Sequence, residues 1–186
     1  NILMGLPLLF EITMRSGIDY IAYLQQAGAV YHGETDYTML SSTLGPCYYP
    51  AGHLFHYIPV YMLHLYTEHA EEIMKFVHLL IHSTLIVYIS LIADMYFSKD
   101  HFKKDVKKGK PMMSLEAQFI GFIMLANKED RGYYMLMFND EIMILYVVLC
   151  IYFTLKSRPI LASIFFTLGL SVKAGVVLLL PAFLGQ

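Results

Sequence analysis

Long apolar stretches constrain this chain more than any other feature. Four of them approach or exceed the roughly 18–20 residues that a helix needs to cross a bilayer: Cys47–Tyr66, Ile73–Phe97, Tyr133–Phe153 and Ile160–Leu184. Two weaker stretches are Ile2–Met14 and Met112–Ala126. Only 15% of the 186 residues are charged, against about 25% in an average soluble protein. The pattern predicts an all-α polytopic membrane protein.

Charge and cysteine content exclude several other classes. The formal net charge is −2 and no basic stripe is present, so a nucleic-acid partner is not expected. Cys47 and Cys150 lie far apart in apolar surroundings, which excludes a disulfide scaffold and a cysteine-based zinc site. The chain starts inside one apolar run and stops after another. We therefore expect residues 1–186 to form one membrane domain, the amino-terminal part of a longer protein.

The lysines indicate how the chain is oriented. Six of them fall within residues 98–111, so this loop is predicted to be cytoplasmic: Lys99, Lys103, Lys104, Lys107, Lys108 and Lys110. Alternation of sides then places residues 15–72 together on the opposite face. Cys47–Tyr66 should therefore not span, and its prolines and histidines suit an interfacial or re-entrant helix pair. The result is about five spans with a long first external loop.

The long loop carries acids and tyrosines in a glycine-punctuated sequence. Asp19 and Asp36 are its leading acids, and Tyr37 follows the second of them. Such residues suit sugar binding, since carboxylates accept hydroxyl hydrogen bonds and flat rings stack on sugars. One carboxylate could also act as a general base. The alternative is solvated turn residues with an aspartate N-cap for a helix over Tyr20–Ala29.

A second group of polar residues lies inside the apolar stretches. Asn139, Asp140 and Glu141 come early in one predicted span, and Lys173 lies deep in the next. Antiparallel packing could pair Lys173 with Asp140. Charged residues inside a membrane are costly and often functional, so the pair predicts an anion site in which Lys173 binds phosphate. The alternatives are a purely structural ion pair or a snorkelling lysine.

The histidines have metal-like spacings. His53 and His56 form HxxH, and His78 and His82 form HxxxH. Membrane di-iron proteins use such boxes. However, the second pair lies inside a span and no third box is present, so hydrogen bonding between helices is favoured for His78 and His82. We assign no metal ligand.

Several short motifs resemble one family. In the long loop these are Ile18-Asp19-Tyr20, Gly33 to Thr38, Gly45-Pro46 and Tyr49 to Gly52. Further on they are Met137 to Asp140 and Ser171-Val172-Lys173. In order and spacing they resemble the dolichyl-phosphate-mannose-dependent α-1,3-mannosyltransferases of the Asn-linked glycosylation pathway. The resemblance covers nearly the whole chain, but only about the amino-terminal half of a complete family member.

This resemblance implies a GT-C type glycosyltransferase of the endoplasmic reticulum membrane, with residues 15–72 in the lumen. Such an enzyme transfers mannose from dolichyl-phosphate-mannose to the pentamannosyl lipid-linked oligosaccharide, with inversion at C1. The resemblance also implies that Asp19 acts as the base and that Lys173, helped by His53, stabilises the leaving phosphate. The other residues expected to bind substrate are Asp36, Tyr37, Tyr49, Asn139 and Asp140. Beyond the donor substrate no cofactor is implied, and a metal ion is not obligatory.

The chain departs from the family pattern at three points. Gly17 replaces an acid two residues before Asp19, Leu136 or Arg131 occupies the place of an arginine, and Gly175 replaces an asparagine. Two other functions stay open on the sequence alone. A histidine-box membrane di-iron oxidoreductase predicts bound iron and further histidine boxes, and a non-catalytic membrane scaffold predicts neither.

Overall fold

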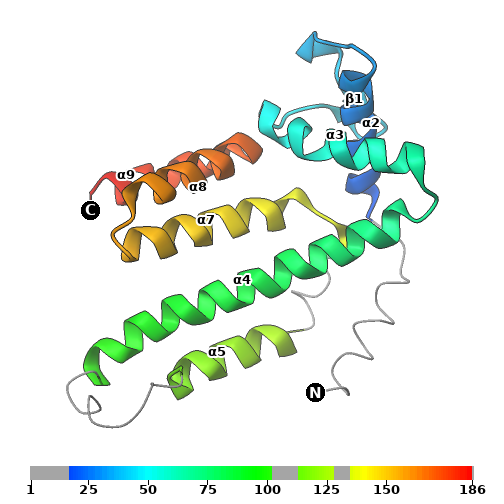
Figure 1. Cartoon of the computed structure of the whole chain (residues 1–186). Coiled ribbons are helices and arrows are strands. Elements are labelled where there is room, and N and C mark those ends of the chain that lie inside the picture. Colours follow the sequence, from blue (N-terminus) through cyan, green and yellow to red (C-terminus); the bar gives the residue numbers. More distant parts are fainter. Residues whose placement is uncertain (1–16, 102–112, 128–134, 186) are drawn as a thin grey trace.

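The computed structural model describes residues 17–101, 113–127 and 135–185, and it is mostly helical (Figure 1). This confirms the helical class. The main helices are α2 (Ile18–Tyr31), α3 (Ala51–Tyr66), α4 (Ala70–His101), α5 (Leu115–Ala126), α7 (Asn139–Leu155), α8 (Pro159–Val172) and α9 (Leu180–Leu184). The described residues also form two short 3-10 helices, η1 (Tyr37–Met39) and η2 (Ala174–Leu179). An antiparallel hairpin consists of β1 (Ser41–Ser42) and β2 (Gly45–Pro46).

The helices form two groups. α4 packs against both α5 and α7, and α7 packs against α8, so these four lie side by side (Figure 1). α2 and α3 pack on each other at one end of this layer, where α3 also contacts α4 and α8. The site residues come from the place where the two groups meet.

α4 is the membrane-length helix of the described residues. Its segment Ala70–Phe97 has 28 residues, or about 42 Å at ~1.5 Å per residue, which exceeds the roughly 30 Å of a bilayer core. This confirms a helix over Ile73–Phe97 that is long and apolar enough to cross a membrane. The helix continues to His101, beyond the predicted start of the 98–111 loop. The rest of that loop and the predicted Ile2–Met14 span lie outside the described residues.

α5 and α7 are shorter than the spans predicted for them. α5 has 12 residues, or about 18 Å. The span expected from Tyr133 starts instead at Asn139, and Tyr133 itself lies outside the described residues. The correction has a clear backbone cause: Met137 adopts a left-handed φ of 54° and Phe138 is extended, so no helix runs through them. The Met137 carbonyl accepts a hydrogen bond from Tyr57 at 3.1 Å.

The prediction of one straight span over Ile160–Leu184 is wrong. α8 ends at Val172, Lys173 is extended (φ −140°, ψ 125°), and the chain then turns back along α8. Phe183 stacks on Phe166 at 5.2 Å between ring centroids, which holds the returning segment. Lys173 therefore lies at a helix end and not deep within a span. The arrangement buries more apolar surface on α8 than a straight helix could bury by itself.

α3 also differs from its prediction. The expected helix pair within Cys47–Tyr66 is one continuous helix that contains Pro59. Proline removes one backbone hydrogen bond, but Tyr57 and Val60 on either side of it are buried against α2. The helices approach closely, since a Cβ atom on Gly28 would lie 2.7 Å from the ring of Tyr61. Gly28 is needed for that approach.

The start of α2 differs from the alternative in which an aspartate forms the N-cap of this helix. Helix α2 runs from Ile18 to Tyr31 and its N-cap is Gly17, without a side-chain cap. Asp19 is therefore not an N-cap for a helix over Tyr20–Ala29. It lies in the first helical turn, where a carboxylate is stabilised by the positive end of the helix dipole.

Candidate functional site between α3, α7 and α8

Lys173 and Asp140 form an ion pair. The Nζ atom of Lys173 lies 2.5 Å from Oδ1 of Asp140, and the two side chains are 25% and 38% exposed. Asp140 is in the first turn of α7 and Lys173 ends the neighbouring antiparallel helix, so both charges oppose their helix dipoles favourably. The pairing predicted from the sequence is confirmed. Because both groups keep exposed surface, the ammonium can still meet a ligand.

Tyr49 lies beside this pair. The Nζ atom of Lys173 is 5.5 Å from the centroid of the Tyr49 ring, within the range of a cation–π contact. The same ring is 4.5 Å from the imidazole of His53. Tyr49 therefore contacts both residues that the sequence proposed for phosphate binding.

Asn139 connects three elements through its side chain. It is fully buried, and its Nδ2 lies 3.0 Å from Nδ1 of His53 on α3. Its Oδ1 accepts a hydrogen bond of 3.3 Å from the hydroxyl of Tyr23 on α2. Gly52, next to His53, sits against Ser171 of α8, since a Cβ atom there would lie 2.3 Å from Ser171 Oγ. Small size at position 52 lets α3 reach α8 and places His53 at the site.

His53 is enclosed by aromatic rings. The rings of Tyr23, Tyr49 and Tyr57 have their centroids 4.7, 4.5 and 4.9 Å from the imidazole. Burial, with smaller effects from His56 and the positive charge of Lys173, lowers the pKa of His53 to about 3. The ring is therefore neutral at physiological pH. Its Nε2 atom is buried and has no hydrogen-bond partner among the described residues.

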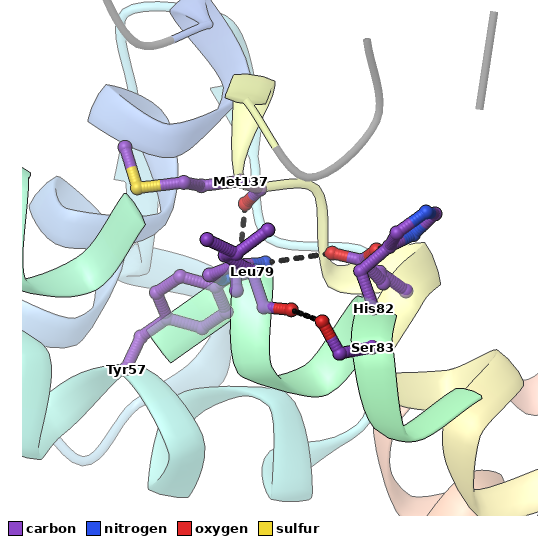
Figure 2. Close-up of polar contacts among 7 residues, drawn as sticks. Tyr57, Leu79, His82, Ser83 and Met137 are labelled. Atoms are coloured by element: carbon purple, nitrogen blue, oxygen red, sulfur yellow. Dashed lines mark hydrogen bonds and ion pairs between the residues drawn. The ribbon is translucent and has the colours of Figure 1, made fainter. Parts of the chain in front are cut away.

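Glu141 fastens α7 to α4. It is 3% exposed, and its two oxygens lie 3.1 Å from Nδ1 of His78 and 2.8 Å from Nδ1 of His82. Figure 2 shows His82 on α4, one turn beyond Leu79, whose carbonyl accepts from Ser83 at 2.8 Å. The predicted role of these histidines in hydrogen bonding between helices is confirmed. Within the described ranges, no group of three His, Cys, Asp or Glu side chains could hold a metal ion.

Asp19 lies apart from the hydrogen-bonded group. In the part of the chain that the structure describes, no hydrogen bond or ion pair reaches its carboxylate, which is half-buried. Tyr23 follows one helical turn later. Burial raises the pKa of Tyr23 far above its ordinary value, and the neighbouring Tyr49 and the negative charge of Asp19 add to this effect. Asp19 is therefore electrostatically coupled to the Tyr23 side of the site.

Asp36 and Tyr37 are structural parts of the loop. Asp36 caps η1, accepting from the amide of Thr38 at 2.9 Å and from its hydroxyl at 2.7 Å. These two bonds lower the pKa of Asp36. Tyr37 donates to the carbonyl of Tyr49 and so helps to fix the backbone there. The structure thus brings Tyr49, His53, Asn139, Asp140 and Lys173 together, holds Tyr37 at their edge, and leaves Asp36 in an exposed turn.

Tyr23 and Tyr57 were not predicted as site residues. Both are buried, Tyr23 bonding Asn139 and Tyr57 bonding the Met137 carbonyl at the start of α7 (Figure 2). A helical pattern could have revealed Tyr23, because Tyr20, Tyr23 and Ala27 follow the i, i+3, i+7 spacing of a buried face. The partner of Tyr23 on α7 lies 116 positions later in the chain, and local spacing carries no information about it.

These features define the class of the protein: a helical protein with one helix of membrane length among the described residues and a partly exposed lysine–aspartate pair between helix ends. The chain belongs to the ALG3 protein family, whose model matches residues 8–185.

Curated relatives carry names that agree with this assignment. The chain is 30% identical, over 90% of its length and 40% of the relative's, to a probable Dol-P-Man:Man(5)GlcNAc(2)-PP-Dol alpha-1,3-mannosyltransferase of Dictyostelium discoideum. It is 26% identical to the l(2)not2 mannosyltransferase of Drosophila melanogaster, over 90% of the chain and 31% of the relative. For the Neurospora crassa mannosyltransferase the identity is 27%, with coverages of 89% and 33%.

The chain therefore spans between three and four tenths of the length of these relatives. No solved structure matches it.

Proposed function

We propose that this chain is the amino-terminal part of an inverting mannosyltransferase. It would transfer mannose from dolichyl-phosphate-mannose, in α-1,3 linkage, to the pentamannosyl dolichol-diphosphate oligosaccharide during assembly of the N-glycan precursor. Family membership and the names of the relatives support this proposal. The observation that carries it is the Lys173–Asp140 pair, which holds a cation in place with part of its surface still exposed.

The chemistry requires a counter-charge for the leaving group. A bond forms between the acceptor oxygen and C1 of mannose, while the bond from C1 to the phosphate oxygen breaks and leaves dolichyl phosphate. Negative charge develops on that phosphate. Lys173 can stabilise it by moving from Asp140 towards the phosphate oxygens, and His53 lies near enough to assist. Preorganised charge in a site of low water content is an efficient way to lower such a barrier.

The acceptor hydroxyl must also lose its proton. We propose Asp19 as the general base, because no described residue donates a hydrogen bond to its carboxylate and its oxygens remain available. The proton moves from the hydroxyl to the carboxylate as the new bond to C1 forms. The donor linkage is β and the product linkage is α, so a single displacement with no covalent intermediate accounts for the inversion.

The proposal includes a cellular setting. We place the protein in the endoplasmic reticulum membrane as a multi-pass, GT-C type enzyme, with residues 15–72 in the lumen and residues 98–111 in the cytoplasm. The membrane-length helix α4 supports this arrangement. Of about five membrane segments, the last is a hairpin at Lys173 and not a straight span. We propose that Lys173 supplies the positive charge and that no bound metal or cofactor is used.

The alternatives have weaker support. An iron-dependent oxidoreductase would need a cluster of ligands, and among the described residues no group of three His, Cys, Asp or Glu side chains could hold a metal ion. A non-catalytic scaffold has no need of the exposed ammonium of Lys173. The family match favours the mannosyltransferase over both.

The direct test is an assay of the longest natural form of the protein. It should be purified in detergent and given dolichyl-phosphate-mannose with a synthetic pentamannosyl lipid-linked acceptor. We expect one mannose to be added, sensitive to an α-1,3-specific mannosidase. The same preparation of the Lys173→Met variant should be strongly impaired. A wild-type protein that binds both lipids but transfers no mannose would contradict the proposal.

A further inference from the structure

We propose that His53 donates a hydrogen bond from Nε2 to a phosphate oxygen of the donor lipid, as a neutral imidazole, and that Tyr23 and Asn139 are positioning residues that fix its tautomer. This inference rests on the proposed function and specifies how the phosphate is held. It assigns a role to one buried nitrogen and to two residues that do not themselves touch the ligand.

The argument begins at Tyr23. Its hydroxyl is buried and donates a hydrogen bond of 3.3 Å to Oδ1 of Asn139. An amide oxygen only accepts and an amide nitrogen only donates. The Asn139 amide is thereby oriented with Nδ2 towards His53, 3.0 Å from Nδ1.

The orientation of Asn139 determines the tautomer of His53. Since Nδ2 of Asn139 donates, Nδ1 of His53 must accept and carries no proton. A neutral imidazole has one N–H, so the proton of His53 resides on Nε2. The hydroxyl of Tyr23 on α2 therefore determines, through Asn139 on α7, which ring nitrogen of His53 carries the proton.

The Nε2 atom of His53 then becomes an N–H donor without an acceptor. The residue is fully buried, and no described residue bonds this atom. Buried donors are nearly always paired, and an unpaired one commonly marks a functional position. A phosphate group bound by Lys173 would supply an oxygen that accepts a hydrogen bond from Nε2 of His53.

Tyr49 contacts both donors. Of the three rings that contact His53 it is the only one that keeps appreciable exposure, and it also contacts Lys173. A phosphate bound to Lys173 would reach Nε2 when the Tyr49 ring moves aside. A neutral donor suits this position, because an imidazolium beside Lys173 would add repulsion between like charges before the phosphate arrives.

The first experiment reads the tautomer directly. The longest natural form of the protein, labelled with 15N-histidine in lipid bilayers, is studied by solid-state NMR, and the His53 signals are assigned by difference from the His53→Gln variant. We expect an Nε2–H imidazole between pH 5 and 8, whose Nε2 resonance shifts when dolichyl phosphate is added. An Nδ1–H tautomer in the wild-type protein would overturn the inference.

The second experiment reverses the tautomer. In Asn139→Asp an ionised carboxylate can only accept, so Nδ1 of His53 must carry a proton, and in a ring that stays neutral Nε2 becomes an acceptor. We expect affinity for dolichyl phosphate to fall about 10- to 100-fold, the range for a lost hydrogen bond to a charged group. His53→Leu should lose a similar factor, whereas His53→Gln, which keeps a neutral N–H donor, should lose less. Equal affinities in His53→Leu and His53→Gln would contradict the inference.

Matched variants separate positioning from packing. Tyr23→Phe removes only the hydroxyl that orients Asn139, and we expect a mixture of tautomers with an intermediate loss of affinity. Tyr31→Phe removes a hydroxyl from the same helix that does not bond Asn139 or His53. It should leave the tautomer of His53 and the affinity for dolichyl phosphate unchanged. Inorganic phosphate, tested in competition, separates recognition of the phosphate group from recognition of the lipid tail. We expect the variants to weaken both ligands by the same factor.

The outcomes also separate this inference from the proposed function. If Lys173→Met weakens dolichyl phosphate and the wild-type protein transfers mannose, but His53→Leu has no effect on affinity, the proposed function stands and the inference is wrong. If wild-type protein with an Nε2–H tautomer binds phosphate but transfers no mannose, the inference stands and the mannosyltransferase proposal is wrong.

Discussion

Glu141 and His82 lie 59 positions apart in the chain, and their Oε1 and Nδ1 atoms are 2.8 Å apart in the fold. The second oxygen of the same carboxylate bonds His78, so one side chain at the start of α7 fastens two successive turns of α4. Asn139 and Asp140 immediately precede Glu141. The position of the candidate site therefore depends on a buried contact that lies outside it.

Removal of this contact should destabilise the protein. We expect Glu141→Leu to lower the free energy of unfolding by about 3–5 kcal/mol, the range for breaking a buried pair by removing one partner. Glu141→Gln should cost less, because an amide can still accept one of the two bonds. Thermal unfolding in detergent measures both. Glu68→Gln, at an exposed position, is the control. An equally large loss of stability in Glu68→Gln would contradict the assignment of a stabilising contact to Glu141.

Lys173 should act on the donor substrate. We expect Lys173→Met to raise the KM for dolichyl-phosphate-mannose and to lower turnover, each by about 10- to 100-fold, as a lost charge-assisted interaction implies. Steady-state kinetics with varied donor and saturating acceptor measure both parameters. If Lys173→Met retains wild-type kinetics, Lys173 has only the structural role of pairing with Asp140.

The two loop acids should differ in their effects. We expect Asp19→Asn to reduce turnover by about 10²- to 10⁴-fold with little change in KM, since that is the usual contribution of a general base. Asp36→Asn should keep the turn, because an amide oxygen can accept both bonds from Thr38, whereas Asp36→Ala should lose it and raise KM. Kinetics of all three variants, with varied acceptor, measure these effects. Activity retained in Asp19→Asn and abolished in Asp36→Asn would exchange the two assignments.

His53 should make stability depend on pH. Its pKa is about 3 when folded, against 6.5 for an unperturbed histidine, so below pH 6.5 the unfolded state binds a proton that the folded state does not. The contribution of neutral His53 to the free energy of unfolding is complete above pH 6.5. It declines as the pH falls towards 3, and about 2 kcal/mol of it is lost at pH 5. The melting temperature should fall between pH 7 and pH 5. In His53→Gln this fall should be smaller, and an unchanged fall would assign the effect to other groups.

The proposed orientation can be tested by labelling. Cys47 and Cys150 are buried, so engineered cysteines at exposed positions dominate the reaction. In intact microsomes an impermeant maleimide should label Lys156→Cys at once, and Glu68→Cys only after the membrane is opened by detergent. Immediate labelling of Glu68→Cys from the cytoplasmic side would show that residues 67–72 are not luminal.

The predictions from sequence succeeded where the signal was local or could be recognised as a motif. The apolar run of α4 needed only composition and length. The ion pair of Lys173 and Asp140 followed from two charges in neighbouring apolar segments. The family followed from several short motifs in the right order, which the family match confirms.

The failures have physical causes that composition does not record. The residues on both sides of Lys173 are equally apolar, so hydropathy does not reveal that the chain reverses there. The left-handed backbone at Met137 is similarly hidden, because methionine has no preference for that conformation. The contact of Tyr23 with Asn139 depends on three helices meeting, and the tertiary fold alone brings them together.

The reversal at Lys173 has a consequence for sidedness. The returning segment ends beside the last turn of α7, where Ala182 and Leu155 line the same apolar cavity of about 160 Å³. A straight span would have delivered Gly185 to the lumen. In the proposed orientation the hairpin returns it towards the cytoplasmic face, along α8. Any transmembrane helix joined after Gly185 would then cross in the direction opposite to the one that hydropathy counting assigns, with every luminal and cytoplasmic loop beyond it exchanged.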